Sequence, residues 1–476
     1  MLDLLIEGGE LIDGTGGLRR LADIGIMGDK VVAIGRLADQ PARQRVNAKG
    51  RIVAPGFIDV HTHDDCLLLH SPGGVHPKLS QGVTTVITGN CGISLAPLLT
   101  KAPPAPLDLL GTSDWRFDSF ADYLDALEQA QPIVNAACLV GHSTLRVKHM
   151  QALDRAATPD ECARMADDLE SALQAGAIGM STGVYYPPAQ SATTDELIAV
   201  GKPLSAASGL VTMHIRDEGD AITAALREAL HVGKALGITT VLSHHKLVGT
   251  ANHGRSHETL GMIEAADAQG QSVCMDCYPY NASSTMLLPA RVHQSSDVLV
   301  TWSKTEPQAA GRSLFDLAKE RNQAPEYVAK ALQPAGAIYF AMDEADVSRI
   351  MAHPLAMIGS DGLAHDAAPH PRLWGTFPRV LGRYVREQRL LSLELAIHKM
   401  TGLSVRRFGL QGRGVLAVGN FADVVIFDEH HVTDRASYQQ PTQVSTGIDA
   451  VYVNGVLACV QGQTVNSHAG RVLRRA

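Results

Sequence analysis

Imidazole, thiol and carboxylate groups, the side chains that bind divalent metal ions, end several short apolar segments of this chain. His61 and His63 end one such segment, and Cys91 ends the next. Because residues i and i+2 of a strand point to the same side, both imidazoles can reach one ion. A lone histidine is usually structural, and this chain contains 20, so the prediction depends on the whole set falling at segment ends. The other members of the set are His214, His244 or its neighbour His245, and Asp361.

The apolar segments that precede these residues predict strands, and the Ala-, Leu- and Glu-rich stretches between most of them predict helices. Alternating strands and helices imply parallel pairing, and eight such units imply a closed (β/α)8 barrel of the α/β class. Reactive residues of this barrel lie at the carboxyl ends of its strands. The predicted strand segments are residues 53–63, 83–90, 136–143, 177–183, 210–217, 239–246, 272–280 and 356–362.

Both ends of the chain show short strand patterns without helices. An Asn-Gly pair at residues 454 and 455 lies between apolar alternations, which is a strong hairpin signal because both residues tolerate positive φ. We therefore predict a small β-sandwich domain built from residues 1–54 and 405–476 around a barrel of residues 55–404. The stretch at about 285–350, between the seventh and eighth strands, is too long for an ordinary connection and predicts an insertion.

The composition excludes several classes of protein. The net charge of −8 lacks the basic surplus that nucleic-acid binding needs. No apolar run reaches the ~18 residues of a membrane span, and the acidic start MLDLLIEGGELIDG is unlike a signal peptide. Seven scattered cysteines favour a reducing compartment, so we expect a cytoplasmic protein without nucleic-acid or membrane partners. The composition indicates no oligomeric state.

Five stretches of the sequence together resemble one family. GFIDVHTHDD, SQGVTTVITGNCGISLAPL, MHIRDE, SHHK and GSDG are similar to the amidohydrolase superfamily, and specifically to its D-aminoacylase (N-acyl-D-amino-acid deacylase) family. PAGAIYFAMDE and HPRLWG resemble the N-acyl-D-glutamate deacylase branch most closely. The resemblance implies zinc-dependent hydrolysis of the amide bond of a small N-acyl-D-amino acid, with N-acyl-D-glutamate as the favoured substrate.

The resemblance also implies a set of metal ligands. Many amidohydrolases have a carboxylated lysine at the end of the fourth strand, but here that strand ends Ser181-Thr182-Gly183. The D-aminoacylase family uses a cysteine after the second strand instead, and Cys91 stands there. A thiolate suits zinc because sulfur is a soft ligand. We therefore expect a tight zinc site formed by Cys91, His214 and His244 and a weaker second site formed by His61, His63, Cys91 and Asp361.

The reaction needs a proton carrier and groups that bind the substrate. Asp361 is placed to take a proton from water and to give it to the leaving nitrogen. Lys246, Tyr278 and Arg372 match family positions that hold the α-carboxylate of the amino acid. Ser283, Ser284 and Arg291 resemble the positions that bind the distal carboxylate in the D-glutamate branch.

Other functions fit parts of the same pattern. A broad-specificity D-aminoacylase would act on apolar N-acyl-D-amino acids, and a cyclic-amide hydrolase of the hydantoinase or dihydroorotase type would need the missing lysine. A deaminase would not explain Cys91, and a non-catalytic scaffold would not explain the complete ligand set. The Cys274–Cys277 pair invites a redox reading, but its place inside the seventh strand segment predicts core packing.

Overall fold

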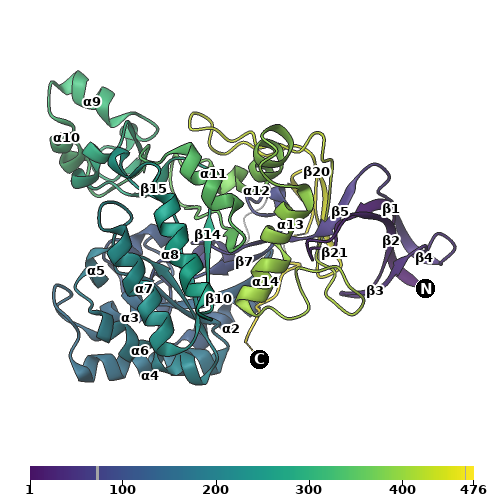
Figure 1. Ribbon diagram of the computed structural model, residues 1–476, viewed down its shortest axis with the longest axis horizontal. Coiled ribbons are helices and arrows are strands. Elements are labelled where there is room, and N and C mark those ends of the chain that lie inside the picture. The colour runs from purple at the N-terminus through teal and green to yellow at the C-terminus, as the bar shows by residue number, and fades with distance from the viewer. Residues whose placement is uncertain (71–73, 467, 476) are drawn as a thin grey trace.

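The computed structural model describes residues 1–70, 74–466 and 468–475, and its centre is the predicted barrel (Figure 1). Eight parallel strands follow one another in the order β6-β7-β10-β11-β12-β13-β14-β18. The ring closes where Asp361, just after β18, donates its N–H to the carbonyl oxygen of His61 at 2.8 Å. The strands are β6 Phe57–Asp59, β7 Val83–Thr88, β10 Asn135–Gly141, β11 Gly179–Gly183, β12 Leu210–His214, β13 Thr239–Leu242, β14 Val273–Cys277 and β18 Ala356–Ile358.

The barrel strands are buried on both faces, which explains why they read as continuous apolar runs. One cluster of buried side chains fills the barrel interior, and it includes Ile58, Leu139, Val241 and Cys274. Cys277 points the other way and packs against the helical layer, so this cysteine pair is part of the core, as predicted. The covering helices are α2 Phe120–Ala130, α3 His142–His149, α4 Pro159–Ala175, α6 Thr194–Ala206, α7 Ile222–Leu236, α8 Ser256–Ala268, α11 Glu344–Ala352, α12 Arg372–Arg379 and α13 Leu393–Met400.

Strands from the two ends of the chain share a nine-stranded sheet, ordered β22-β21-β20-β19-β5-β1-β2-β3 with β4 beside β1. The two ends meet where β19 pairs antiparallel with β5. The pairing of β1 with β2 contains a bulge, marked by a register shift between Ile6 and Gly9. The strands are β1 Leu2–Leu11, β2 Arg20–Met27, β3 Lys30–Gly35, β4 Ala42–Asn47, β5 Ile52–Pro55, β19 Val424–Phe427, β20 Ile448–Val453, β21 Val456–Val460 and β22 Gln463–Thr464.

The insertion between the seventh and eighth barrel strands is a small unit with a core of its own (Figure 1). Its three-stranded antiparallel sheet has the order β15-β17-β16. Helices α9 Leu314–Arg321 and α10 Pro325–Leu332 cover this sheet. The strands are β15 Ser283–Met286, β16 Val298–Ser303 and β17 Ala335–Tyr339. Because β15 starts the unit directly after the barrel mouth, the insertion supplies one wall of the site described below.

The expected domain limits remain a prediction. The limit between residues 404 and 405 falls within α14 Gly402–Phe408, and Leu403 and Phe408 belong to the cluster inside the barrel. Near the C-terminus, Val472 forms a parallel bridge with Ala136 of β10, so the tail returns to the barrel. In the part of the chain that the structure describes, no helix combines the length and the apolar character that crossing a membrane requires.

Candidate active site

A cluster of buried metal-binding groups lies at the carboxyl ends of the barrel strands. The Sγ atom of Cys91 lies 3.2 Å from Nε2 of His61 and 3.4 Å from Nε2 of His244. Nδ1 of His214 lies 2.9 Å from the same His244 nitrogen. Cys91 is thus shared by two groups whose ligand atoms lie within 4.8 Å of one another, namely Cys91–His214–His244 and His61–His63–Cys91–Asp361. The structure therefore brings together every residue that the sequence nominated as a metal ligand.

The adjacent histidines that follow β13 point to different parts of the molecule. His244 faces Cys91, whereas Nε2 of His245 lies 2.9 Å from Oγ1 of Thr259, on helix α8. The imidazole of His245 is therefore occupied in the helical layer, and His244 is the histidine at the cluster.

Three of the clustered residues have backbone conformations that L-residues rarely adopt. Cys91, His244 and Asp361 have φ angles of 55°, 36° and 51°. Each lies just after a barrel strand, where the chain turns sharply and returns its side chain over the barrel mouth. Such left-handed positions cost of order 1–3 kcal/mol and concentrate at functional sites.

The loop that carries Cys91 packs tightly against the end of the fourth barrel strand. A Cβ atom on Gly183, at the end of β11, would overlap the carbonyl oxygen of Cys91. Gly92 is equally confined, because its own Cβ would meet the backbone nitrogen of Gly183 at 2.6 Å. A side chain at residue 183 is therefore incompatible with the Cys91 loop, which argues against the bridging lysine of cyclic-amide hydrolases.

Two carboxylates that the sequence reasoning did not single out support the clustered histidines. Asp276 Oδ1 lies 3.2 Å from Nδ1 of His61 and accepts the backbone N–H of His244 at 2.9 Å. Glu218 Oε1 lies 3.2 Å from Nδ1 of His244. Carboxylates placed behind metal-binding histidines fix the ring orientation and the tautomer. Glu218 lies within the MHIRDE stretch. Asp276 lies between Cys274 and Cys277, in a stretch that the sequence analysis interpreted only as core packing.

The electrostatics of the cluster favour charged ligands. Burial alone would raise the pKa of the Cys91 thiol, but the imidazoles of His61 and His244 hold that pKa well below its ordinary value. Burial would likewise raise the pKa of Asp361, and the Arg372 guanidinium, 2.9 Å from Oδ2, holds it well below the ordinary range. Both shifts favour the charged forms, a thiolate at Cys91 and a carboxylate at Asp361.

A buried ion pair ties the first barrel strand to the segment before Asp361. Nζ of Lys78, which is fully buried, donates to Oδ2 of Asp59 at 2.8 Å and to Oγ of Ser360 at 2.9 Å. The backbone N–H of Ser360 donates to the other oxygen of Asp59 at 2.7 Å. These bonds fix the segment that places Asp361 relative to His61.

Beside the cluster, a cationic wall of buried side chains includes several polar groups that have no hydrogen-bond partner among the described residues. These are the hydroxyls of Tyr278 and Ser284 and the Nε and Nη1 nitrogens of Arg372. The remaining nitrogen of Arg372, Nη2, donates to Asp361 and to the carbonyl oxygen of Ser284, at 3.2 Å from the latter. Because unsatisfied buried polar groups are costly, this wall is suited to a polar ligand.

Arg291 contributes a second positive charge to this wall, from the insertion. Its guanidinium lies over the rings of Tyr339 and Tyr185, at 4.7 and 5.6 Å from their centroids, and donates to Oγ of Ser283 at 3.4 Å. Only 6% of the residue is exposed, and no carboxylate of the described chain pairs with it. A buried cation without a partner is expensive unless a ligand supplies the counter-charge.

Lys246 is already engaged. Its ammonium forms an ion pair with Glu218 and lies 2.7 Å from Nδ1 of His244. Its ring neighbour is Tyr278, whose centroid is 5.7 Å away. Lys246 therefore lines the pocket, as expected. Its ammonium already pairs with Glu218, so Glu218 competes with the α-carboxylate of a ligand for this cation.

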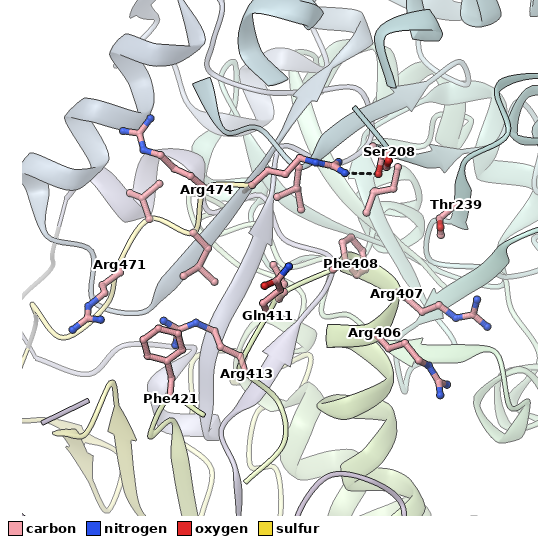
Figure 2. Close-up of a pocket in the computed structure, with 18 residues that line it drawn as sticks. Ser208, Thr239, Arg406, Arg407, Phe408, Gln411, Arg413, Phe421, Arg471 and Arg474 are labelled. Atoms are coloured by element: carbon pink, nitrogen blue, oxygen red, sulfur yellow. Dashed lines mark hydrogen bonds between the residues drawn. The ribbon is translucent and has the colours of Figure 1, made fainter. Parts of the chain in front are cut away.

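A separate hollow lies away from the metal cluster (Figure 2). It measures about 580 Å³ and is lined by Leu210 and Thr239, the first residues of β12 and β13, so it opens at the opposite end of the barrel from the metal cluster. Arginines surround it, but Arg413, Arg471 and Arg474 pair with acidic residues outside it. None of the candidate site residues lines this hollow.

A closed barrel with thiolate, imidazole and carboxylate groups gathered at its strand ends is the architecture expected of a metal-dependent hydrolase. Comparison with known proteins specifies the family. The family model "Amidohydrolase family" matches residues 44–311 and 315–458. The chain is 55% identical to a D-aminoacylase of Alcaligenes xylosoxydans xylosoxydans over 99% of this chain and 98% of the relative. It is 51% identical to an N-acyl-D-glutamate deacylase of the same organism over 100% and 97%.

A solved structure agrees with these matches. The N-acyl-D-glutamate deacylase from Bordetella bronchiseptica, complexed with zinc and a phosphonate inhibitor, superposes with a TM-score of 0.95 at 46% identity, covering 100% of both chains. The chain therefore belongs to the amidohydrolase family, as a metal-dependent hydrolase of the D-aminoacylase group.

Proposed function

We propose that this protein hydrolyses the amide bond of N-acyl-D-amino acids with zinc, releasing a carboxylate and the free D-amino acid, and that it favours N-acyl-D-glutamate. The observation that supports this most directly is the juxtaposition of a buried Cys–His–Asp cluster with a wall of unpaired cationic and hydroxyl groups. Relatives that act on N-acyl-D-amino acids at about half identity over their whole length support the same substrate class.

The donor set fits zinc. One thiolate and two imidazoles at Cys91, His214 and His244 are ligands that zinc prefers, and they would form the tight site. His61, His63, Cys91 and Asp361 would form the weaker site. When bound, zinc supplies a Lewis acid that polarises the acyl carbonyl and lowers the pKa of water.

The residues of the chain itself provide proton transfer and positioning. Asp361, ionised at neutral pH, accepts a proton from the attacking water and passes it to the nitrogen as the C–N bond breaks. Arg372 can keep Nη2 on Asp361 while its two unpaired nitrogens bind the α-carboxylate, and the free hydroxyl of Tyr278 can donate to the same group. Lys246 adds positive charge at this side of the pocket, subject to its pairing with Glu218.

The assignment of glutamate depends on Arg291. Its guanidinium is the buried cation of this wall that lacks a carboxylate among the described residues, and Ser283 and Ser284 lie beside it on β15. A second carboxylate on the substrate would satisfy it at low desolvation cost, because the cation is already buried. An apolar side chain would leave the charge unpaired.

A panel of substrates tests the proposed activity. Zinc-loaded protein should release free amino acid from N-acetyl-D-glutamate and, more slowly, from N-acetyl-D-aspartate, N-acetyl-D-methionine and N-acetyl-D-leucine. The matching L-compounds and a hydantoin should be poor substrates. Hydrolysis of the hydantoin alone would contradict the proposal, and a preference for D-leucine over D-glutamate would identify a broad-specificity D-aminoacylase instead.

Replacing Arg291 with methionine should lower kcat/KM on N-acetyl-D-glutamate far more than on N-acetyl-D-leucine. A hydrogen bond to a charged group contributes roughly 1.5–3 kcal/mol, equivalent to about tenfold to a hundredfold. The matched variant, Arg372→Met, should lower the rate on both substrates alike, because every substrate has an α-carboxylate. Equal losses on acidic and apolar substrates with Arg291→Met would assign Arg291 to the α-carboxylate and withdraw the glutamate preference.

A further inference from the structure

The pocket is lined by apolar residues as well as by its cationic wall. Ile93, Leu109 and Leu363 line it together with the clustered metal-binding residues, and they are 0%, 3% and 4% exposed. Ile93 belongs to the loop of Cys91, and Leu363 follows Asp361 by two residues. The two sides therefore flank the metal cluster and present contrasting chemistry to the two ends of a bound molecule.

A second hollow lies next to the pocket and shares His63 with it. It has a volume of about 530 Å³, and its described lining residues are His63, Cys66, Leu67, His70, Leu110, Ala364 and His365. His63 lines both spaces, and two neighbouring pairs, Leu109–Leu110 and Leu363–Ala364, each give one residue to the pocket and the next to the hollow. The linings of the two spaces are therefore adjacent at three places, namely at His63 and at these two pairs.

Four of the seven described lining residues of the hollow are apolar, namely Cys66, Leu67, Leu110 and Ala364. The thiol of Cys66 donates to the carbonyl oxygen of Leu110 at 2.9 Å, and burial raises the pKa of this thiol, so it stays neutral. At the outer rim, Nε2 of His70 lies 2.9 Å from Oδ2 of Asp114. A hydrocarbon chain is the ligand that such a lining favours.

We propose that this second hollow, beyond His63, is the subsite for the acyl chain of the substrate and that it admits acyl groups longer than acetyl. This inference rests on the proposed function. The carbonyl carbon of an amide joins the nitrogen on one side and the acyl chain on the other. If the carboxylates of the amino acid meet the cationic wall, the acyl chain must leave the cluster toward Ile93, Leu109 and Leu363 and enter the hollow.

The chain-length dependence of the wild type is the first measurement. Complete burial of a methylene is worth roughly fourfold in binding, from about 0.8 kcal/mol. Allowing for partial burial, kcat/KM should rise about tenfold from the N-acetyl to the N-butanoyl derivative of the favoured D-amino acid. The N-octanoyl derivative should remain a substrate, and octanoate should inhibit the N-acetyl reaction more strongly than acetate does.

Substitution of Ala364 tests the place of the subsite. Ala364 is only partly buried, so Ala364→Trp can fill the hollow without disturbing the core. It should cut kcat/KM on the N-octanoyl substrate at least tenfold, with little change on the N-acetyl substrate. In this variant octanoate should inhibit the N-acetyl reaction no more strongly than acetate does. Leu67 lies on helix α1 Asp65–Leu69 and also lines the hollow, so Leu67→Trp should act in the same way. Ala367→Trp, in the same loop but exposed and outside the lining, is the matched control and should leave the chain-length profile unchanged.

The outcomes separate the inference from the proposed function. If no N-acyl-D-amino acid is hydrolysed, the proposed function itself is wrong. If the N-acetyl substrate is hydrolysed but activity falls as the acyl chain grows, the acyl subsite is wrong and the proposed function stands. Equal effects of Ala364→Trp on short and long acyl groups would also overturn the subsite, and circular dichroism checks that each variant is folded.

Discussion

Cys91→Ala is expected to lose the tightly bound zinc and nearly all activity. Cys91 is the residue common to both ligand groups, so its removal leaves each group one ligand short. It also supplies the soft, negatively charged donor, whose pKa the neighbouring imidazoles hold low. The zinc content after dialysis, measured by mass spectrometry, should fall from about one ion per chain to near zero.

A second buried cysteine provides the control for this experiment. Cys274 is fully buried inside the barrel and belongs to neither ligand group. Burial raises the pKa of its thiol to about 12. Cys274→Ala should cost some stability through the lost packing but should keep zinc and turnover. Retention of stoichiometric zinc and normal turnover by Cys91→Ala would remove Cys91 from the metal site. Melting temperatures of both variants distinguish metal loss from misfolding.

Asp361→Asn is expected to keep the tight zinc but to lose about 10²–10⁴ in kcat, the usual contribution of general acid–base catalysis. Cys91, His214 and His244 form a group without Asp361, so the metal should stay. Asparagine tolerates the left-handed backbone of this position, where φ is 51°, so the substitution adds little strain. It cannot accept the proton, and it leaves Arg372 without its carboxylate.

Asp366 offers a matched control for Asp361. It lies on the same loop, is buried, and has a pKa that burial raises to about 7. Asp366→Asn should therefore change the shape and charge of the loop only slightly and should leave kcat within a few fold of the wild type. A loss below roughly tenfold for Asp361→Asn, or an equal loss for both variants, would exclude Asp361 as the proton carrier.

The barrel and its reactive end were predictable because their signals are local. Each barrel strand is an apolar run followed by a polar residue, and parallel strands place those ends at one edge of the sheet. His61, His63, Cys91, His214, Asp361 and one of the pair His244 and His245 could therefore be nominated from their positions alone. The choice of His244 over His245 came from the family resemblance, and the structure shows that His244 contacts Cys91 whereas His245 contacts Thr259 in the helical layer.

The supporting residues were not predictable, because their meaning lies in contacts between distant parts of the chain. Asp276 contacts His61 across 215 residues, and Lys78 reaches Ser360 across 282. Neither residue stands in a pattern that distinguishes it from an ordinary buried or surface charge. Only the folded chain shows that each one holds a reactive segment in place.

The sequence by itself determined the fold class, the family and the types of ligand atoms, because periodicity and strand-end chemistry are written along the chain. Only the tertiary structure decided how these groups are paired. It placed Arg372 on Asp361, engaged Lys246 with Glu218, and left Arg291 buried without a carboxylate among the described residues. Whether a charge is neutralised depends on the few ångströms around it, and those neighbours come from strands and loops that meet only when the barrel closes.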